Sequence, residues 1–212
     1  MNERKKIKKI GIRATAPNQI WHIDVTVINL RPGKKFYIQS VIDNYSRFVL
    51  AWNVTDSINA INTIQTLNLA KKKTLSVQEG EHPIVMMDPG SENRNLTVSE
   101  YIASANLRRL IARVEIHYSN SMIESLFKSL KNNYLYHQGV RTIEDLNRKA
   151  TFYFRQYNEV VPHAVLKGGI PSEVYHSLWT KEAQDELQKM KSKAMTYRKL
   201  QNIVPPCGTC VG

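Results

Sequence analysis

The chain has 212 residues, of which 42% are hydrophobic and 23% are charged, as is ordinary for a globular protein. This composition excludes collagen-like, disulfide-scaffold and wholly disordered proteins, and the length predicts one domain with an appendage. The 30 Lys and Arg residues outnumber the 18 Asp and Glu residues, which gives a formal net charge of +12. Such a surplus favours a polyanionic partner. Because the sequence has no lipid-anchor or basic amphipathic membrane pattern, we expect nucleic acid and no membrane.

Other sequence features indicate where the protein acts. No apolar run approaches the ~20 residues that cross a membrane, and the basic N-terminal segment is not followed by the apolar stretch of a secretory signal. The two cysteines, Cys207 and Cys210, stand near the C-terminal end, so the predicted core has no disulfide. We interpret this pair as part of a disordered tail or as half of a zinc site shared between chains. A cytoplasmic protein is expected.

Composition divides the chain into three parts. Residues 1–14 are interpreted as a basic arm or linker, 15–178 as the core, and 179–212 as a basic helix and tail. The arm either contacts DNA or is a solubilising tail. The basic helix predicted at 182–200 either faces DNA or a second copy of the chain, or is simply solvated.

The first half of the core begins with strand-like segments at 19–29, 35–42 and 47–54. Turn-forming residues separate them, which predicts an antiparallel meander. Helical spacing follows at 55–75, and a short apolar run at 83–87 fits a buried strand. Helical spacing returns at 98–110, and 112–116 is predicted as the last strand.

The second half of the core is mostly helical. An amphipathic pattern predicts a strong helix over 119–137, and a capping box at Thr142 opens a second helix over 142–157. A short helix is expected at 172–178, after Pro171. This order of elements predicts an α/β domain, a mixed sheet with helices on both faces, whose ligands bind beyond the strand ends.

Three carboxylates stand where a ligand site is expected. Asp24 lies inside the apolar first strand, where an acid costs free energy unless it faces a site or a partner. Asp88 directly follows the buried-type strand, and Glu124 opens the strong helix. Each also has a structural interpretation: a salt-bridged core acid, a turn-forming residue and a favourable helix first turn, respectively.

Two lysines follow Glu124 on the same helix face, Lys128 at the fourth and Lys131 at the seventh position. An acid that holds a cation, continued by lysines that hold phosphates, suits a metal-dependent phosphodiester site. The alternative is an ordinary Glu–Lys pair that stabilises the helix by a few tenths of a kcal/mol.

Five ordered segments resemble motifs of the DDE transposases of bacterial insertion sequences, which are relatives of retroviral integrases. Thirty-five residues lie between Asp88 and Glu124, a spacing found in many members of that family. The resemblance covers roughly residues 15–178. The segments are WHIDVT (21–26), VIDNYSR (41–47), MDPGSE (87–92), NSMIESLFKSLK (120–131) and YNEVVPHAVLKGGIPSEVY (157–175).

The resemblance implies a ribonuclease H-like mixed five-stranded sheet with helices on both faces. It implies that Asp24, Asp88 and Glu124 are catalytic and hold two Mg²⁺ or Mn²⁺ ions, Asp24 bridging them. DNA contacts are expected at Asn120, Lys128 and Lys131. The implied activity is metal-dependent nicking of DNA at transposon ends and strand transfer to target DNA, by a homo-oligomer associated with the bacterial nucleoid.

Other motif positions are interpreted structurally. Asp43 and Arg47 are expected to form a turn pair, and His163 is expected to pack in the core.

The sequence departs from the family pattern around two of the acids. Met86 and Pro89 flank the second acid where many members have His and a polar or basic residue, and Ser119 replaces an Asp before Asn120. The helix-turn-helix region that precedes the core in the family is missing, so we expect recognition of transposon ends to lie elsewhere. Two alternatives therefore stay open: a non-catalytic DNA-binding remnant of a transposase, and a nuclease acting on RNA–DNA hybrids.

Overall fold

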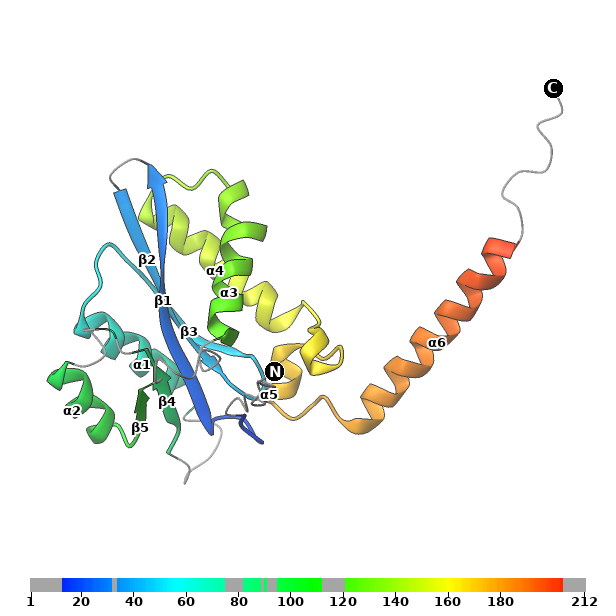
Figure 1. Cartoon of the computed structure of the whole chain (residues 1–212), viewed down its shortest axis with the longest axis horizontal. Helices are drawn as coiled ribbons and strands as arrows, with labels where there is room; N and C mark the ends of the chain where they lie inside the picture. The colour runs from blue at the N-terminus through cyan, green and yellow to red at the C-terminus, as the bar shows by residue number, and fades with distance from the viewer. Residues whose placement is uncertain are drawn as a thin grey trace, which may run out of the picture.

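The structure, a computed structural model, describes residues 13–31, 34–74, 82–88, 90, 95–111 and 121–203. Five strands in these residues form one mixed sheet in the order β3-β2-β1-β4-β5 (Figure 1). The strands β1 (Ile20–Arg31), β2 (Lys34–Asp43) and β3 (Val49–Thr55) form the predicted antiparallel meander. The strands β4 (Ile84–Met87) and β5 (Arg108–Ile111) extend the sheet in parallel beyond β1.

The helices lie on both faces of the sheet, as predicted. One face packs against α1 (Ala60–Thr74), α2 (Leu96–Ser104) and α5 (Pro171–Tyr175). The other packs against α3 (Ser121–Asn133), the short η1 (Leu135–His137) and α4 (Ile143–Glu159). The segment after α4 contains the single-turn η2 (Ala164–Leu166).

The alternation of side chains along β1 decides which residues can meet which helices. Trp21 and Ile23 belong to the core beneath α1 and α2, whereas Ile28 belongs to the core beneath α3 and α4. Because successive side chains point to opposite faces of a strand, even-numbered residues of β1 face α3. Asp24 is one of them.

The predicted boundaries were wrong around α2 and β5. The helix expected over 98–110 ends at Ser104, and β5 begins at Arg108. Asn106, with φ of 56°, adopts the left-handed conformation that ends helices, and Leu107 N–H bonds back to the carbonyl of Ile102. The strand predicted at 112–116 lies outside the described residues.

Other helix ends also differ from the prediction. Helix α1 begins at Ala60 rather than at residue 55, because β3 continues through Thr55. Helix α3 ends at Asn133 and is followed by η1, so the helix predicted over 119–137 is two elements. The N-cap predicted at Thr142 is confirmed, since its hydroxyl accepts from the backbone N–H of Asp145 at 3.2 Å.

The turn between β2 and β3 is built around the buried carboxylate of Asp43. This carboxylate accepts the backbone N–H and hydroxyl of Ser46, at 2.8 and 2.6 Å, and the backbone N–H of Asn18 at 2.8 Å. Burial raises the pKa of Asp43, and these hydrogen bonds oppose the rise. Arg47 follows at φ of 66°, and its Nη1 donates to the carbonyl of Asn44 at 2.6 Å. Both residues hold the turn, as the sequence suggested.

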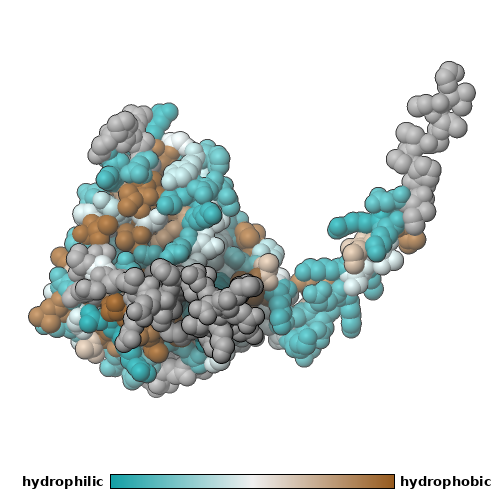
Figure 2. All heavy atoms as spheres, in the orientation of Figure 1, coloured by the Kyte–Doolittle hydropathy of each residue, from teal (hydrophilic) through white to brown (hydrophobic). Residues whose placement is uncertain are grey.

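Helix α6 (Lys181–Ile203) projects away from the sheet and its other helices (Figure 1). Hydrophilic side chains cover most of it in Figure 2. Near its start, Leu187 and Lys191 approach Gly168, in the segment after η2. In the part of the chain that the structure describes, neither α6 nor any other helix is long and apolar enough to cross a membrane.

Candidate active site

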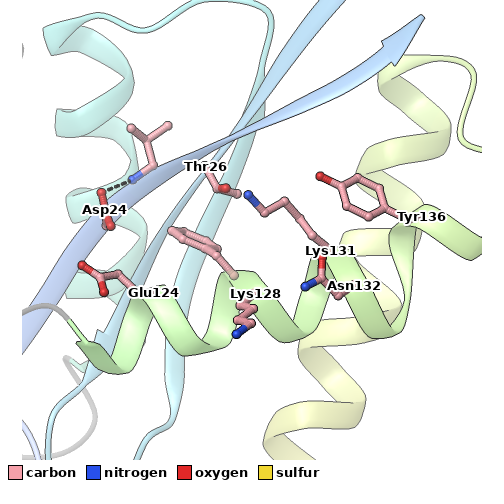
Figure 3. Close-up of a pocket in the computed structure, with 9 residues that line it drawn as sticks. Asp24, Thr26, Glu124, Lys128, Lys131, Asn132 and Tyr136 are labelled. Carbon is pink, nitrogen blue, oxygen red and sulfur yellow. Dashed lines mark hydrogen bonds between the residues drawn. The ribbon is translucent and has the colours of Figure 1, made fainter.

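A pocket of about 340 Å³ lies between β1 and α3 on the α3 side of the sheet. Both Asp24 and Glu124 line it, and Figure 3 shows their side chains pointing toward each other. The pocket continues along α3 past Lys128 and Lys131. Four of the six residues predicted to form the site therefore meet here: two acids and two lysines.

Asp24 is positioned by the central strand of the sheet. It lies opposite Ser40 in the antiparallel pairing of β1 and β2, and its side chain is half-buried. One carboxylate oxygen accepts the backbone N–H of Val25 at 2.8 Å. This bond orients the carboxylate into the pocket, where Figure 3 shows it beside the start of α3.

Glu124 reaches the pocket because α3 is anchored by its apolar side. Ile123, Leu126, Phe127 and Leu130 are buried against the sheet and α4, as the amphipathic pattern predicted. That burial leaves Glu124 on the edge of the helix beside β1, in the first turn, with its side chain exposed. A first-turn carboxylate is also favoured by the helix dipole.

Asp88 directly follows β4, the parallel neighbour of β1. The parallel pairing of the two strands ends at His22 and Met86, so Asp24 and Asp88 each lie two residues beyond the last aligned pair. Val85 and Met87 belong to the core on the α1 side, and by alternation Asp88 would follow on the α3 side. However, Asp88 does not line the pocket. Its Oδ1 accepts the backbone N–H of Gly90 at 3.4 Å, the turn interaction that the Asp-Pro-Gly sequence suggests.

The two lysines take different directions from α3. In Figure 3 the Lys131 side chain extends back toward Thr26 of β1, whereas Lys128 turns outward. The pocket therefore has acids at the N-terminal end of α3 and ammonium groups further along the helix.

Sequence reasoning missed the far end of the pocket. Thr26, Asn132 and Tyr136 line it as well. Asn132 could have been found by continuing the four-residue spacing from Glu124 and Lys128. Tyr136 could not, because its position depends on the chain leaving α3 at Asn133 and turning through η1.

The three predicted metal-binding acids are not grouped into one cluster in this structure. Across the residues it describes, no three His, Cys, Asp or Glu side chains are grouped closely enough to hold a metal ion. Asn120, the remaining predicted DNA contact, lies outside the described residues, as do the 1–12 arm segment and the Cys207–Cys210 pair.

Two family models together match most of the chain. Residues 14–117 match a family described as "Integrase core domain", and residues 103–171 match a second family model of the same description. The chain belongs to the integrase core family. The resemblance read from the sequence motifs is confirmed.

Curated relatives are bacterial insertion-sequence proteins. The chain is 30% identical over 167 residues to the probable transposase for IS1353 of Shigella flexneri, an alignment covering 78% of this chain and 32% of that protein. It is 26% identical over 161 residues to the putative transposase InsK for IS150 of Escherichia coli, covering 76% of this chain and 56% of that protein. The chain thus spans about a third of the first relative and just over half of the second.

Solved structures show the same fold at low sequence identity. The HTLV-2 integrase catalytic core domain in complex with magnesium (dimeric form) matches with a TM-score of 0.57 and 18% identity, over 77% of this chain and 100% of that chain. A chain of the simian T-cell lymphotropic virus intasome matches with a TM-score of 0.65 and 16% identity, over 79% and 58%. The catalytic domain of Mos1 mariner transposase matches with a TM-score of 0.51 and 15% identity, over 65% and 70%. The predicted ribonuclease H-like fold is confirmed.

Proposed function

We propose that the chain is the catalytic core of a DNA transposase, which nicks DNA at transposon ends and joins the freed 3′ ends to target DNA. The observation that carries the proposal is the meeting of Asp24 and Glu124 in a pocket that continues along a helix bearing Lys128 and Lys131. The integrase core family and the transposase names of the curated relatives support it.

Asp24, Asp88 and Glu124 would hold the divalent cations. Carboxylate oxygens are the ligands that Mg²⁺ and Mn²⁺ prefer, and two of the three acids already share one pocket. The third is supported because Asp24 and Asp88 each lie two residues beyond the last aligned pair of the parallel strands β1 and β4. One relative of the same fold, the HTLV-2 core, is described in complex with magnesium. When bound, such a cation activates the attacking oxygen and stabilises the leaving one.

Lys128 and Lys131 would bind the phosphates next to the cleaved bond. Their charges lie one and two turns along α3 from Glu124, so they would neutralise backbone phosphates on one side of the reacting group. Asn120 would contact DNA beside them, a role that rests on its motif position alone. A homo-oligomer would bring two transposon ends together, and the HTLV-2 core is described in a dimeric form.

Plasmid nicking by the purified chain tests the proposal. Supercoiled DNA is incubated with Mg²⁺ or Mn²⁺ and the wild type, or the amide variants Asp24→Asn, Asp88→Asn and Glu124→Gln. Glu100→Gln, on the exposed side of α2, is the matched control. We expect nicking by the wild type and the control and none by the three amide variants.

Two results would contradict the proposal. Nicking by all three amide variants at the wild-type rate would reject these acids as the catalytic residues. DNA binding by the wild type without nicking would favour the non-catalytic DNA-binding remnant. An RNA–DNA hybrid in the same assay distinguishes the hybrid nuclease, which would cleave it in preference to duplex DNA.

A further inference from the structure

A second pocket, of about 360 Å³, lies on the other flank of α3 and has no part in the proposed metal chemistry. Its polar lining comes from three distant stretches of the chain: Arg47 after β2, a row of serines on α3, and Tyr157 with His163 at and beyond the end of α4. Each stretch belongs to one of the five motif segments. Motif residues that have no role around the acids thus meet at one cavity.

The serine row offers hydroxyl groups along one side of the pocket. Ser121, Ser125 and Ser129 follow at intervals of four residues, so they share a face of α3 that differs from the face of Glu124 and Lys128. The Ser129 oxygen accepts from the Tyr153 hydroxyl at 2.9 Å and from Asn133 Nδ2 at 3.2 Å. Because a hydroxyl has two acceptor sites and one proton, these bonds leave Ser129 to act as a donor.

Arg47 supplies a positive charge that is fixed in place. Its backbone is held by the Asp43 turn. Among the described residues its guanidinium donates one hydrogen bond, from Nη1 to the carbonyl of Asn44, which uses one of five N–H groups. No Asp or Glu occurs among the described residues that line this pocket. Asp43 interacts electrostatically with Arg47 from the turn, but it does not line the cavity. A half-buried guanidinium facing a cavity whose described lining has no carboxylate favours an anion there.

His163 brings a buried nitrogen that lacks a partner. Its ring meets the Tyr157 ring edge-on, with centroids 4.4 Å apart, which agrees with the expected packing role. Its Nε2 is nevertheless buried, and among the described residues it has no hydrogen-bond partner. Burial lowers the pKa of His163, a hydrogen bond with the backbone of Tyr157 opposes this, and the charge of Arg47 lowers the pKa further. His163 thus lines the cavity with a ring nitrogen that the described residues leave unsatisfied, and a bound anion would favour its protonated, donating form.

We propose that this pocket binds a phosphate group of the DNA backbone, on the flank of α3 opposite the acids. Arg47 would bind the phosphate through its remaining N–H groups, and His163 and the serine hydroxyls would complete the set of donors. The inference rests on the proposed function, because it takes DNA as the source of the phosphate. It places DNA on both flanks of α3 rather than along the lysine flank alone.

A charge placed at the mouth of the pocket tests the inference. Ser125 is exposed, so Ser125→Asp adds a negative charge there without disturbing the core, while Asn68→Asp adds the same charge on α1, on the opposite face of the sheet. Binding of a fluorescein-labelled DNA duplex is measured by anisotropy at several salt concentrations. We expect Ser125→Asp to weaken binding by about tenfold and to make the salt dependence shallower by about one charge, and Asn68→Asp to match the wild type.

The NMR resonances of the His163 ring report whether an added anion occupies the pocket. We expect its resonances to shift when the duplex is added to the wild type, and to shift clearly less at the same duplex concentration in Ser125→Asp. Wild-type affinity and salt dependence in Ser125→Asp would overturn the inference while leaving the proposed function intact, since the duplex would still bind. A shift with inorganic phosphate that the duplex does not compete away would assign the pocket to free phosphate and also overturn it. A wild-type chain that does not bind the duplex would overturn both proposals.

Discussion

Asp24 of β1 and Glu124 of α3 point toward each other across one pocket. Along the described part of the chain, the four strands β2 to β5 and the helices α1 and α2 lie between β1 and α3. Both residues are attached to the core through their backbones. Asp24 is fixed by the strand pairing of β1, and Glu124 is fixed by the burial of Ile123 and Leu126 beneath α3. The fold therefore brings these two acids together, so substituting either side chain should change the chemistry of the pocket without changing the fold.

The lysine flank of α3 predicts a specific salt dependence of DNA binding. Replacing Lys128 or Lys131 with Ala removes one phosphate contact, so we expect weaker binding and a plot of log affinity against log salt that is shallower by about one. Lys72→Ala is the matched control, because Lys72 is exposed on α1 on the opposite face of the sheet. Fluorescence anisotropy of a labelled duplex at several salt concentrations measures both quantities. Equal losses in all three variants would show that net charge, rather than this pocket, determines binding.

Asn158 is predicted to be a major stabilising residue. Its buried side chain accepts the backbone N–H of Val49 at 2.8 Å and donates to the carbonyl of Val49 at 2.9 Å, thereby joining α4 to the edge strand β3. Because Asn158→Ala leaves both backbone groups of Val49 without this partner, we expect a loss of about 2–4 kcal/mol in the free energy of unfolding.

Urea unfolding measures this loss. Asn147→Ala, at an exposed position of the same helix, is the control and should change the free energy of unfolding by less than about 0.5 kcal/mol. Similar small effects in both variants would mean that the two bonds of Asn158 add nothing to stability.

The buried carboxylate of Asp43 predicts a pH dependence of stability. Burial raises the pKa of Asp43 in the folded protein above its value in the unfolded chain. Its contribution to stability is therefore fully present below about pH 4 and is lost as the pH rises through the folded-state pKa. We expect the stability difference between the wild type and Asp43→Asn to shift against the wild type as the pH is raised from acid to neutral.

Urea unfolding of both proteins across this pH range is the measurement. A difference that shifts in favour of the wild type with rising pH would show that the hydrogen bonds from Ser46 and Asn18 outweigh burial.

The sheet could be predicted from the sequence because its signals are local. Alternating apolar residues and turn chemistry mark β1, β2 and β3. The apolar face of α3 was predicted correctly at four positions, whereas Met122, predicted with them, is only half-buried; the four are Ile123, Leu126, Phe127 and Leu130. The strand β5 was not predicted, and most of it falls in the segment predicted as helix. It is a short edge strand in which Arg108, Arg109 and Leu110 are exposed, so it carries no apolar pattern of its own. Asn106, which ends α2 in the left-handed conformation, was the one local signal for the correct boundary.

The sites could be predicted only in part. The motif resemblance selected Asp24 and Glu124, and the structure brings them together. The second pocket was missed because it needs the tertiary meeting of Arg47, Ser125 and His163, which come from three separate elements. Considered singly, Arg47 is a turn residue and His163 a packing residue, and no periodicity along the chain links them.

Manganese binding tests the central claim most directly. Crystals of the chain grown with Mn²⁺ should show an anomalous peak in the pocket, bonded to oxygens of Asp24 and Glu124 with the Asp88 carboxylate turned toward it. A peak bound elsewhere, or a carboxylate of Asp88 on a surface that cannot reach the same ion, would contradict the account.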